Sequence, residues 1–307
     1  MVRQRSISRR GAIRLVKRWF ELGLIMRVTV AVPCYNGSRY IARTIESLLV
    51  QTRVADEIIV VDDGSVDDSA QIAQSYPVCL VQHAENRGLS AARNTAIVEA
   101  SGEILAFLDV DAFADPDWLT ALLSGYTDPH IAGVGGQGIE TQIHSLADRW
   151  RQCHASQGHG KIAKDVDFLF GMSMSFRRST LQTVGGFNTV FRTNAEDMDI
   201  SFRLRAVGYR LFYQPAARVY HQRVDDEQSL KRTMAAWYRG AYYAKYINRQ
   251  RPWTLFGGTL RRMFLDPLVD IVNKRDFMLA KLSWQIGWVK LAALIQAMKN
   301  TKLNVPT

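Results

Sequence analysis

Two aspartates at the end of an apolar run, Asp109 and Asp111, have the clearest chemical potential in this 307-residue sequence. They follow Ile104–Leu108, whose apolar residues predict a short strand buried on both faces, as in the centre of a parallel sheet. Ligands bind at the carboxyl edge of such sheets, where two carboxylates two residues apart can face one divalent cation and its phosphates. A pair of solvated turn residues is the alternative that an Asp-x-Asp pattern leaves open.

Strands and helices alternate along residues 28–108 and predict the sheet that positions these aspartates. Val28–Val32, Glu57–Val61 and Val78–Val81 have strand character, and a segment with apolar residues at helical spacing follows each of them. This order predicts an α/β fold with a doubly wound, mostly parallel sheet and flanking helices. A polar or glycine-bearing loop follows every strand, so we expect the loops to form one site.

Two common nucleotide-binding motifs do not occur after the first predicted strand. The sequence has neither the Gly-x-Gly-x-x-Gly dinucleotide fingerprint there nor the Gly-Lys-Ser/Thr of a phosphate loop. A nucleotide bound at this edge must therefore be held in another way.

Positive charge is concentrated at the two ends of the chain. The net charge is +10, with +7 in residues 1–27, −8 in residues 28–230 and +11 in residues 231–307. The acidic middle disfavours a nucleic-acid partner, whereas basic ends with aromatic and aliphatic neighbours favour an anionic membrane surface. Three scattered cysteines indicate a reducing compartment. We therefore expect a cytoplasmic protein, peripheral on the inner face of the cell membrane.

The two basic ends are expected to lie outside the catalytic part, residues 27–230. Residues 1–26 are predicted to be a basic leader, which is either a membrane-surface arm or a disordered segment. Residues 231–307 predict aromatic-rich helices, which we expect to lie in the membrane interface; a helical subdomain packed on the core is the alternative. Lys290, within an otherwise apolar surface, argues against a membrane span.

Short motifs spread over residues 27–225 together resemble glycosyltransferase family 2, whose members have the GT-A fold. The matching stretches are Val30–Asn36, Ile59–Ser65, Asn86–Gly88, Ala91–Asn94, Phe107–Asp111, Gly185–Phe187, Glu196-Asp197 and Val219–His221. Cys34, where the family more often has Thr or Ser, is a mild departure. The resemblance implies an inverting sugar transfer from a nucleoside diphosphate sugar, first of all a UDP-sugar, in the synthesis of cell-surface or exopolysaccharide.

The resemblance also assigns residues to the nucleotide part of the donor. Pro33, Tyr35 and Asp62 are expected to line the base and ribose pocket, with Asp63 beside it. Arg93 and Asp109 are expected to approach the ribose and the pyrophosphate.

A cation and a base complete the chemistry that the resemblance implies. Asp111 and Asp109 are expected to bind Mg²⁺ or Mn²⁺, which neutralises the leaving diphosphate, and His221 to complete the metal or pyrophosphate site. Inversion requires a base on the far side of the anomeric carbon, and we predict Asp197 in this role, with Glu196 behind it. Acids at a helix start also simply complement the helix dipole, which is expected to keep their pKa low.

The acceptor is expected to be a saccharide or a lipid-linked molecule bound near the polar stretch 140–166. Trp150 in this stretch is either a stacking platform for a sugar ring or a core residue. Two other functions stay open. A sugar-nucleotide pyrophosphorylase shares the sheet type. By resemblance, that class has a Gly-rich Gly-x-Gly-Thr-Arg loop after its first strand, and this loop does not occur here. A non-catalytic saccharide-binding protein that kept the fold would be expected to lose Asp109, Asp111 or Asp197, and all three are present.

Overall fold

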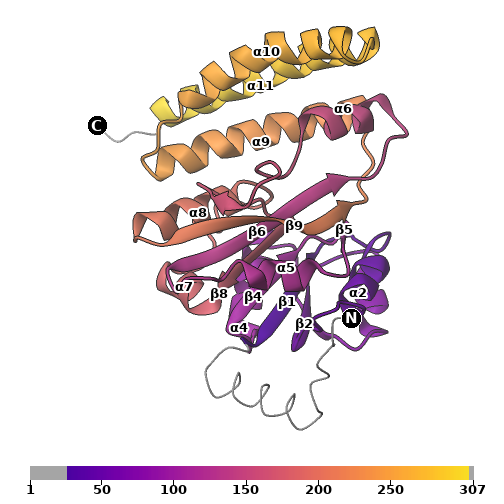
Figure 1. The fold of residues 1–307 in the computed structure, drawn as a ribbon, viewed down its shortest axis with the longest axis vertical. Coiled ribbons are helices and arrows are strands. Elements are labelled where there is room, and N and C mark those ends of the chain that lie inside the picture. The colour runs from indigo at the N-terminus through magenta and orange to yellow at the C-terminus, as the bar shows by residue number, and fades with distance from the viewer. Residues whose placement is uncertain (1–25, 304–307) are drawn as a thin grey trace, which may run out of the picture.

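A nine-stranded mixed sheet forms the centre of the protein in the computed structural model, which describes residues 26–303 (Figure 1). The predicted leader, apart from Met26, lies outside the described residues. The strand order is β3-β2-β1-β4-β8-β6-β9-β5, and β7 pairs with β9. The strands are β1 (Val28–Cys34), β2 (Glu57–Asp62), β3 (Cys79–Gln82), β4 (Ile104–Leu108), β5 (Ala112–Ala114), β6 (Ile131–Glu140), β7 (Lys164–Asp165), β8 (Ser173–Arg177) and β9 (Arg210–His221).

The first four strands, β1 to β4, form the parallel half of the sheet. β1 pairs in parallel with β2 and with β4, and β2 pairs in parallel with β3. The strand predicted at Ile104–Leu108 is confirmed as β4, and all of its residues are buried. Beyond β4 the sheet becomes mixed, because β8 runs antiparallel to both β4 and β6. The predicted α/β fold class with flanking helices is confirmed.

Helices cover both faces of the sheet because successive side chains of a strand point to opposite sides. Ile104 and Ala106 of β4 belong to one apolar cluster, whereas Leu105 and Phe107 belong to the other. The first cluster includes side chains of α2 (Ile41–Leu49), α3 (Ser69–Gln74) and α5 (Trp118–Ser124), and the second includes side chains of α4 (Leu89–Glu99), α7 (Arg178–Thr183) and α8 (Glu196–Ala206).

Four further helices form a layer beyond β6 and β9 (Figure 1). Leu230 and Ile286 pack with Trp150 in one apolar cluster, and Ala244 packs on Phe202 of α8 in another. Trp150 is 1% exposed and donates a hydrogen bond from Nε1 to Ser283 Oγ at 2.8 Å, so it is a core residue and not a sugar platform. These helices are α6 (Leu146–His154), α9 (Glu227–Ile247), α10 (Thr254–Val272) and α11 (Phe277–Leu303).

Lys290 points into this helical layer and not toward solvent. It is 5% exposed, and its Nζ lies 4.8 Å from the ring centroid of Trp150 and 5.1 Å from that of Tyr238. These helices therefore pack on the core, which was the alternative to the favoured position in the membrane interface. Within residues 26–303, no helix is both long enough and apolar enough to cross a bilayer.

Large apolar side chains nevertheless remain exposed on the outer two helices, and we call this set the α10–α11 apolar surface. Three of its aromatic members are in contact, since the ring centroids of Phe264 and Trp284 are 5.6 Å apart and those of Trp284 and Trp288 are 6.2 Å apart. The set consists of Leu260, Phe264, Leu265, Leu268, Val269, Ile271, Val272, Phe277, Met278, Trp284, Trp288 and Ile295.

Candidate active site

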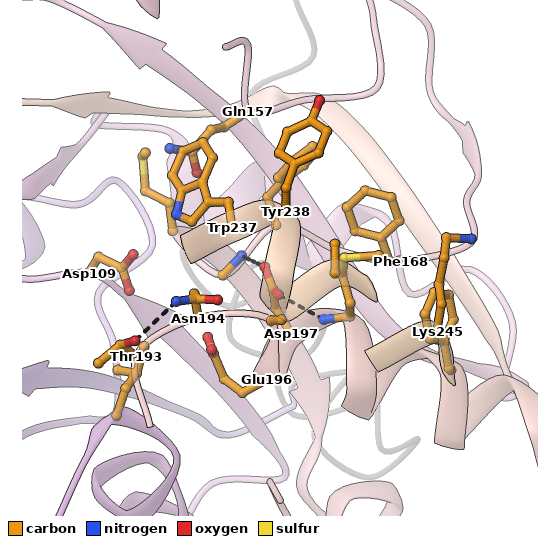
Figure 2. A pocket seen from close by; sticks show the side chains of 18 of the residues that line it. Asp109, Gln157, Phe168, Thr193, Asn194, Glu196, Asp197, Trp237, Tyr238 and Lys245 are labelled. Atoms are coloured by element: carbon orange, nitrogen blue, oxygen red, sulfur yellow. Dashed lines mark hydrogen bonds between the residues drawn. The ribbon is translucent and has the colours of Figure 1, made fainter. Parts of the chain in front are cut away.

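A cavity of about 530 Å³ lies where the ends of β4 and β9 meet the start of α8 and one side of α9 (Figure 2). Asp109, Asp111, Asp197 and His221 all line it. The fold thus brings together four predicted site residues that come from three separate parts of the sequence.

The pairing of β5 with β9 places Asp111 beside His221. Ala112 is the register partner of His221, and His221 Nε2 lies 3.1 Å from Asp111 Oδ2. On the other side of the ring, Nδ1 lies 3.0 Å from Oε1 of the buried Glu140, which is ion-paired with Arg151. Burial lowers the pKa of His221, but Asp111 and Glu140 outweigh it and raise the pKa to about 9. Burial likewise raises the pKa of Asp111, but His221 lowers it overall.

The donor atoms at the end of β4 fit a hard divalent cation that is shared with phosphates. Asp109 and Asp111 offer carboxylate oxygens, with side chains 32% and 25% exposed toward the cavity. In the part of the chain that the structure describes, no three His, Cys, Asp or Glu side chains form a ready-made metal cage. Mg²⁺ in particular is usually bound through one or two carboxylates, waters and substrate phosphates, so two aspartates are sufficient protein ligands.

Arg93 of α4 connects Asp109, after the end of β4, with Glu196, at the start of α8. The side chain is fully buried; its Nη2 donates to Asp109 Oδ1 at 2.9 Å and to the Gly171 carbonyl at 3.1 Å, and its Nη1 pairs with Glu196. Burial raises the pKa of Glu196 to about 7, with Arg93 opposing and Asp197 adding to the rise. The guanidinium therefore pairs with two carboxylates and is stabilised by the charge of a third, that of Asp197. These interactions hold α8 against the end of β4.

Asp197 is held rigidly in the first turn of α8. Its Oδ2 accepts from the Gly171 backbone N–H at 2.8 Å and its Oδ1 from that of Met198 at 2.7 Å (Figure 2). Ala195, just before the two acids, has a φ of 69°, a left-handed conformation that non-glycine residues rarely adopt. Burial raises the pKa of Asp197, in contrast to the low value expected from the helix start, so this carboxylate accepts a proton more readily.

The residues assigned to the base and ribose lie at the ends of β1 and β2, outside the lining of this cavity. Pro33 is buried in β1 and Tyr35, just after it, is 48% exposed. Asp62 and Asp63 are each 2% exposed. Asp63 has a structural role, because its carboxylate accepts hydrogen bonds from Asn86 Nδ2, Arg87 N and Gly88 N and contacts His83 Nδ1.

Several residues of the site were not identified from the sequence. Arg223 lines the cavity two residues after His221, and this spacing was the available signal. Glu140 and Arg151 support His221 from behind, and nothing in their sequence context indicates this contact. Trp237 and Tyr238 of α9 line the cavity, although the sequence favoured a membrane position for them.

Comparisons with known proteins identify relatives of this chain. The family model "Glycosyl transferase family 2" matches residues 29–195 and ends just before Asp197. The glucosyl-dolichyl phosphate glucuronosyltransferase of Haloferax volcanii is 28% identical over 217 residues, which cover 64% of this chain and 69% of that protein. The pre-mycofactocin glycosyltransferase of Mycobacterium tuberculosis is 28% identical over 253 residues, 78% of this chain. The chain spans about half of the length of that relative, 52%.

Solved structures share the fold. The mannosyltransferase PcManGT of Pyrobaculum calidifontis, in complex with GDP-Man and Mn²⁺, superposes with a TM-score of 0.59 at 20% identity, covering 96% of this chain and 83% of that one. TarS of Staphylococcus aureus superposes with a TM-score of 0.56 at 20% identity, covering 89% of this chain and 49% of that one. At these identities the likeness concerns the fold alone.

Proposed function

Since the chain belongs to glycosyl transferase family 2, we propose that it moves a sugar from a nucleoside diphosphate sugar to a saccharide or lipid-linked acceptor in cell-surface or exopolysaccharide synthesis. A UDP-sugar is the first candidate for the donor. The observation that carries this proposal is the position of Asp197 in the same cavity as Asp109 and Asp111. Solved relatives of the same fold hold GDP-Man with Mn²⁺ or UDP, which supports a nucleotide donor.

The nucleoside diphosphate is proposed to bind along the ends of β1, β2 and β4. Pro33, Tyr35 and Asp62 would contact the base and ribose, while Arg93 and Asp109 act near the pyrophosphate. Asp63 would act indirectly, since its hydrogen bonds fix the loop Asn86–Gly88. Mg²⁺ or Mn²⁺, when bound, supplies positive charge against the leaving diphosphate. Asp109 and Asp111 are the residues that would hold it, and His221 would join them as a ligand on release of its proton, because its pKa is about 9.

Asp197 is proposed to act as the base of an inverting transfer. An acceptor oxygen forms the new bond to the anomeric carbon while the bond from that carbon to the diphosphate oxygen breaks, and the acceptor proton passes to Asp197. The two backbone donors that fix this carboxylate support the role, because a general base must keep its geometry during the reaction. Glu196 contacts Arg93 instead and helps to orient it.

A donor screen tests the proposed function. The full chain is titrated with UDP, GDP and a panel of nucleotide sugars, with and without Mn²⁺, and thermal shifts are measured. Products of the donors that bind are then examined by NMR for the anomeric configuration. We expect Mn²⁺-dependent stabilisation by one class of nucleotide sugar and an inverted product. A retained configuration would contradict the role of Asp197.

The two alternative functions predict different outcomes of the same experiments. A sugar-nucleotide pyrophosphorylase would release a nucleoside triphosphate from a nucleotide sugar and pyrophosphate. Its reaction needs no base in the position of Asp197. A non-catalytic saccharide-binding protein would bind sugar without turnover of any donor. The three carboxylates Asp109, Asp111 and Asp197, gathered at one cavity, favour the transferase.

We further propose that the protein works as a peripheral protein on an anionic membrane, on the cytoplasmic face. The α10–α11 apolar surface supports this, because large apolar side chains left exposed on two packed helices mark an interaction site. The exposed cations Arg261, Arg262, Arg275 and Lys281 belong to the same two helices or the turn between them, which suits anionic lipid headgroups. Residues 27–230 remain the proposed catalytic domain, although α9 beyond residue 230 also lines the cavity.

A further inference from the structure

One side of α9 forms a wall of the active-site cavity. Trp237, Tyr238, Ala241 and Lys245 line the cavity, and their positions fall on one side of a helix. Leu230 and Ala244 lie on the same stripe of α9 as Trp237, seven positions away on either side, and they anchor this side of the helix against α6, α11 and α8. Trp237 and Tyr238 are half-buried, since each lines the cavity and also packs against an apolar cluster of the helical layer. Figure 2 shows both rings on the same side of Asp197, with Phe168 nearby.

This wall combines aromatic faces with polar groups. Phe168 and Phe170 line the same cavity with their ring centroids 5.0 Å apart, and Gln157 and Asp197 add hydrogen-bonding groups. A pyranose ring has the matching character, because its C–H face is apolar and its hydroxyl groups point outward in the ring plane. A site for a purely apolar chain would not need the polar groups. A site for a highly charged ligand would be lined mainly by charged groups and not by aromatic rings.

The α9 wall is fixed relative to Asp197 by two close contacts. Gly240 of α9 lies against the loop before α8, where an added Cβ would be 2.2 Å from Asn194 Oδ1 and 2.9 Å from Ala195 Cβ. Lys290 of α11 lies against the Tyr238 ring, with Nζ 5.1 Å from the ring centroid. A ring stacked on α9 would therefore keep a constant position toward the proposed base, as near-attack geometry requires.

We propose that the α9 wall, with Trp237 and Tyr238 as its platform, is the acceptor subsite and takes a pyranose ring of a saccharide. This inference rests on the proposed transferase function and deepens it, since it names the acceptor class and the residues that recognise it. The helical segment after residue 230 then contributes to substrate recognition, in addition to any contact with a membrane.

A glycan array tests the inference with the full chain in the presence of UDP and Mn²⁺. We expect the wild-type chain to bind a restricted set of oligosaccharides. Trp237→Ala should weaken this binding roughly tenfold, as expected for the loss of one stacking contact, whereas Trp237→Phe should retain most of it. Trp253→Ala is the matched control, because Trp253 is 65% exposed and does not line the cavity.

Decyl phosphate serves as the probe for the competing apolar acceptor. Binding of decyl phosphate that is lost in Trp237→Ala, without any dependence of glycan binding on Trp237, would overturn the inference. A wild-type chain that binds no glycan on the array would overturn it as well. UDP affinity, measured on the same samples by calorimetry, separates the two proposals. Normal UDP binding with Trp237-independent glycan binding would refute the acceptor subsite alone, whereas a wild-type chain that binds neither UDP nor any other nucleotide of the donor screen would refute the transferase.

Discussion

His221 Nε2 lies 3.1 Å from Asp111 Oδ2, although 110 positions separate the two residues in the sequence. The antiparallel pairing of β5 with β9 creates this contact, because it aligns Ala112 with His221. The end of the last strand thus completes a site that the end of β4 begins. Changes at either residue should affect the same ligand.

Asp111→Asn should abolish transfer and the enhancement of nucleotide binding by Mn²⁺, because an amide oxygen is a much weaker ligand for a hard cation than a carboxylate. Calorimetric titration of UDP with and without Mn²⁺ measures the effect. Asp115→Asn is a suitable control, since Asp115 follows β5 but contacts Tyr220 and Arg218 outside the cavity. Unchanged metal dependence in Asp111→Asn would contradict its assignment as a ligand.

Asp197→Asn should leave donor affinity near that of the wild type and lower turnover by roughly 10²–10⁴, the range usual for the loss of a general base. The amide keeps the shape of the side chain but cannot accept the acceptor proton. Steady-state kinetics over a range of donor and acceptor concentrations separates kcat from KM. A variant that retains most of its turnover would assign the base to another residue.

Arg93→Ala should destabilise the protein by roughly 3–5 kcal/mol, since it leaves the buried Glu196 and the partly buried Asp109 without their shared cation. Urea unfolding followed by circular dichroism measures this loss. The matched control is Arg205→Ala, because Arg205 pairs with Asp167 at an exposed position where little is expected. Equal effects of the two changes would show that the buried ion pair has no special weight.

Lys290→Met should stabilise the helical layer near pH 7 and much less near pH 10. Burial lowers the pKa of Lys290 from its usual 10.5 to about 8, with Asp266 raising it and Arg262 lowering it further, and the rings of Trp150 and Tyr238 contact its Nζ. Because the folded pKa is the lower one, the unfolded chain binds more protons between pH 8 and 10.5. The free energy of unfolding of the wild type therefore rises with pH through this window.

The methionine variant lacks this rise, so its advantage over the wild type should shrink from at most about 3 kcal/mol to near zero as the pH increases. Thermal melts of both proteins from pH 7 to 10 give the comparison. Lys281→Met, at an exposed position of the same helix, controls for the general effect of removing a cation. A constant difference between Lys290→Met and wild type at all pH values would mean that Lys290 stays charged throughout.

Trp284→Ser combined with Trp288→Ser should weaken binding to vesicles that contain phosphatidylglycerol, because both side chains belong to the α10–α11 apolar surface. Co-sedimentation at low and high salt separates the apolar from the electrostatic part of the attraction. Val66→Ser, at an 88% exposed position in the loop before α3, is the control. A wild-type chain that ignores these vesicles at low salt would rule out the membrane, and a concentration-dependent dimer would assign the surface to a second copy.

The sequence alone was sufficient for the parts of this protein that depend on local pattern. The apolar run Ile104–Leu108 predicted the bounds of β4, and the alternation of strands and helices before it predicted the parallel half of the sheet. The positions of Asp109 and Asp111 at the carboxyl end of β4 follow directly, because a strand fixes where its next residues lie. The family resemblance was likewise carried by short contiguous motifs and is confirmed.

Contacts between distant segments were decided only by the tertiary structure. Glu140 reaches His221 through the pairing of β6 with β9, and Trp237 reaches the cavity because α9 packs on α8. By residue type, Trp150 could stack on a sugar ring and Lys290 could lie at a membrane surface. Both side chains lie instead in the packed helical layer. The physical reason is that hydrophobic periodicity specifies which side of a helix is covered but not which partner covers it, and the partner determines whether an aromatic ring becomes core or cavity wall.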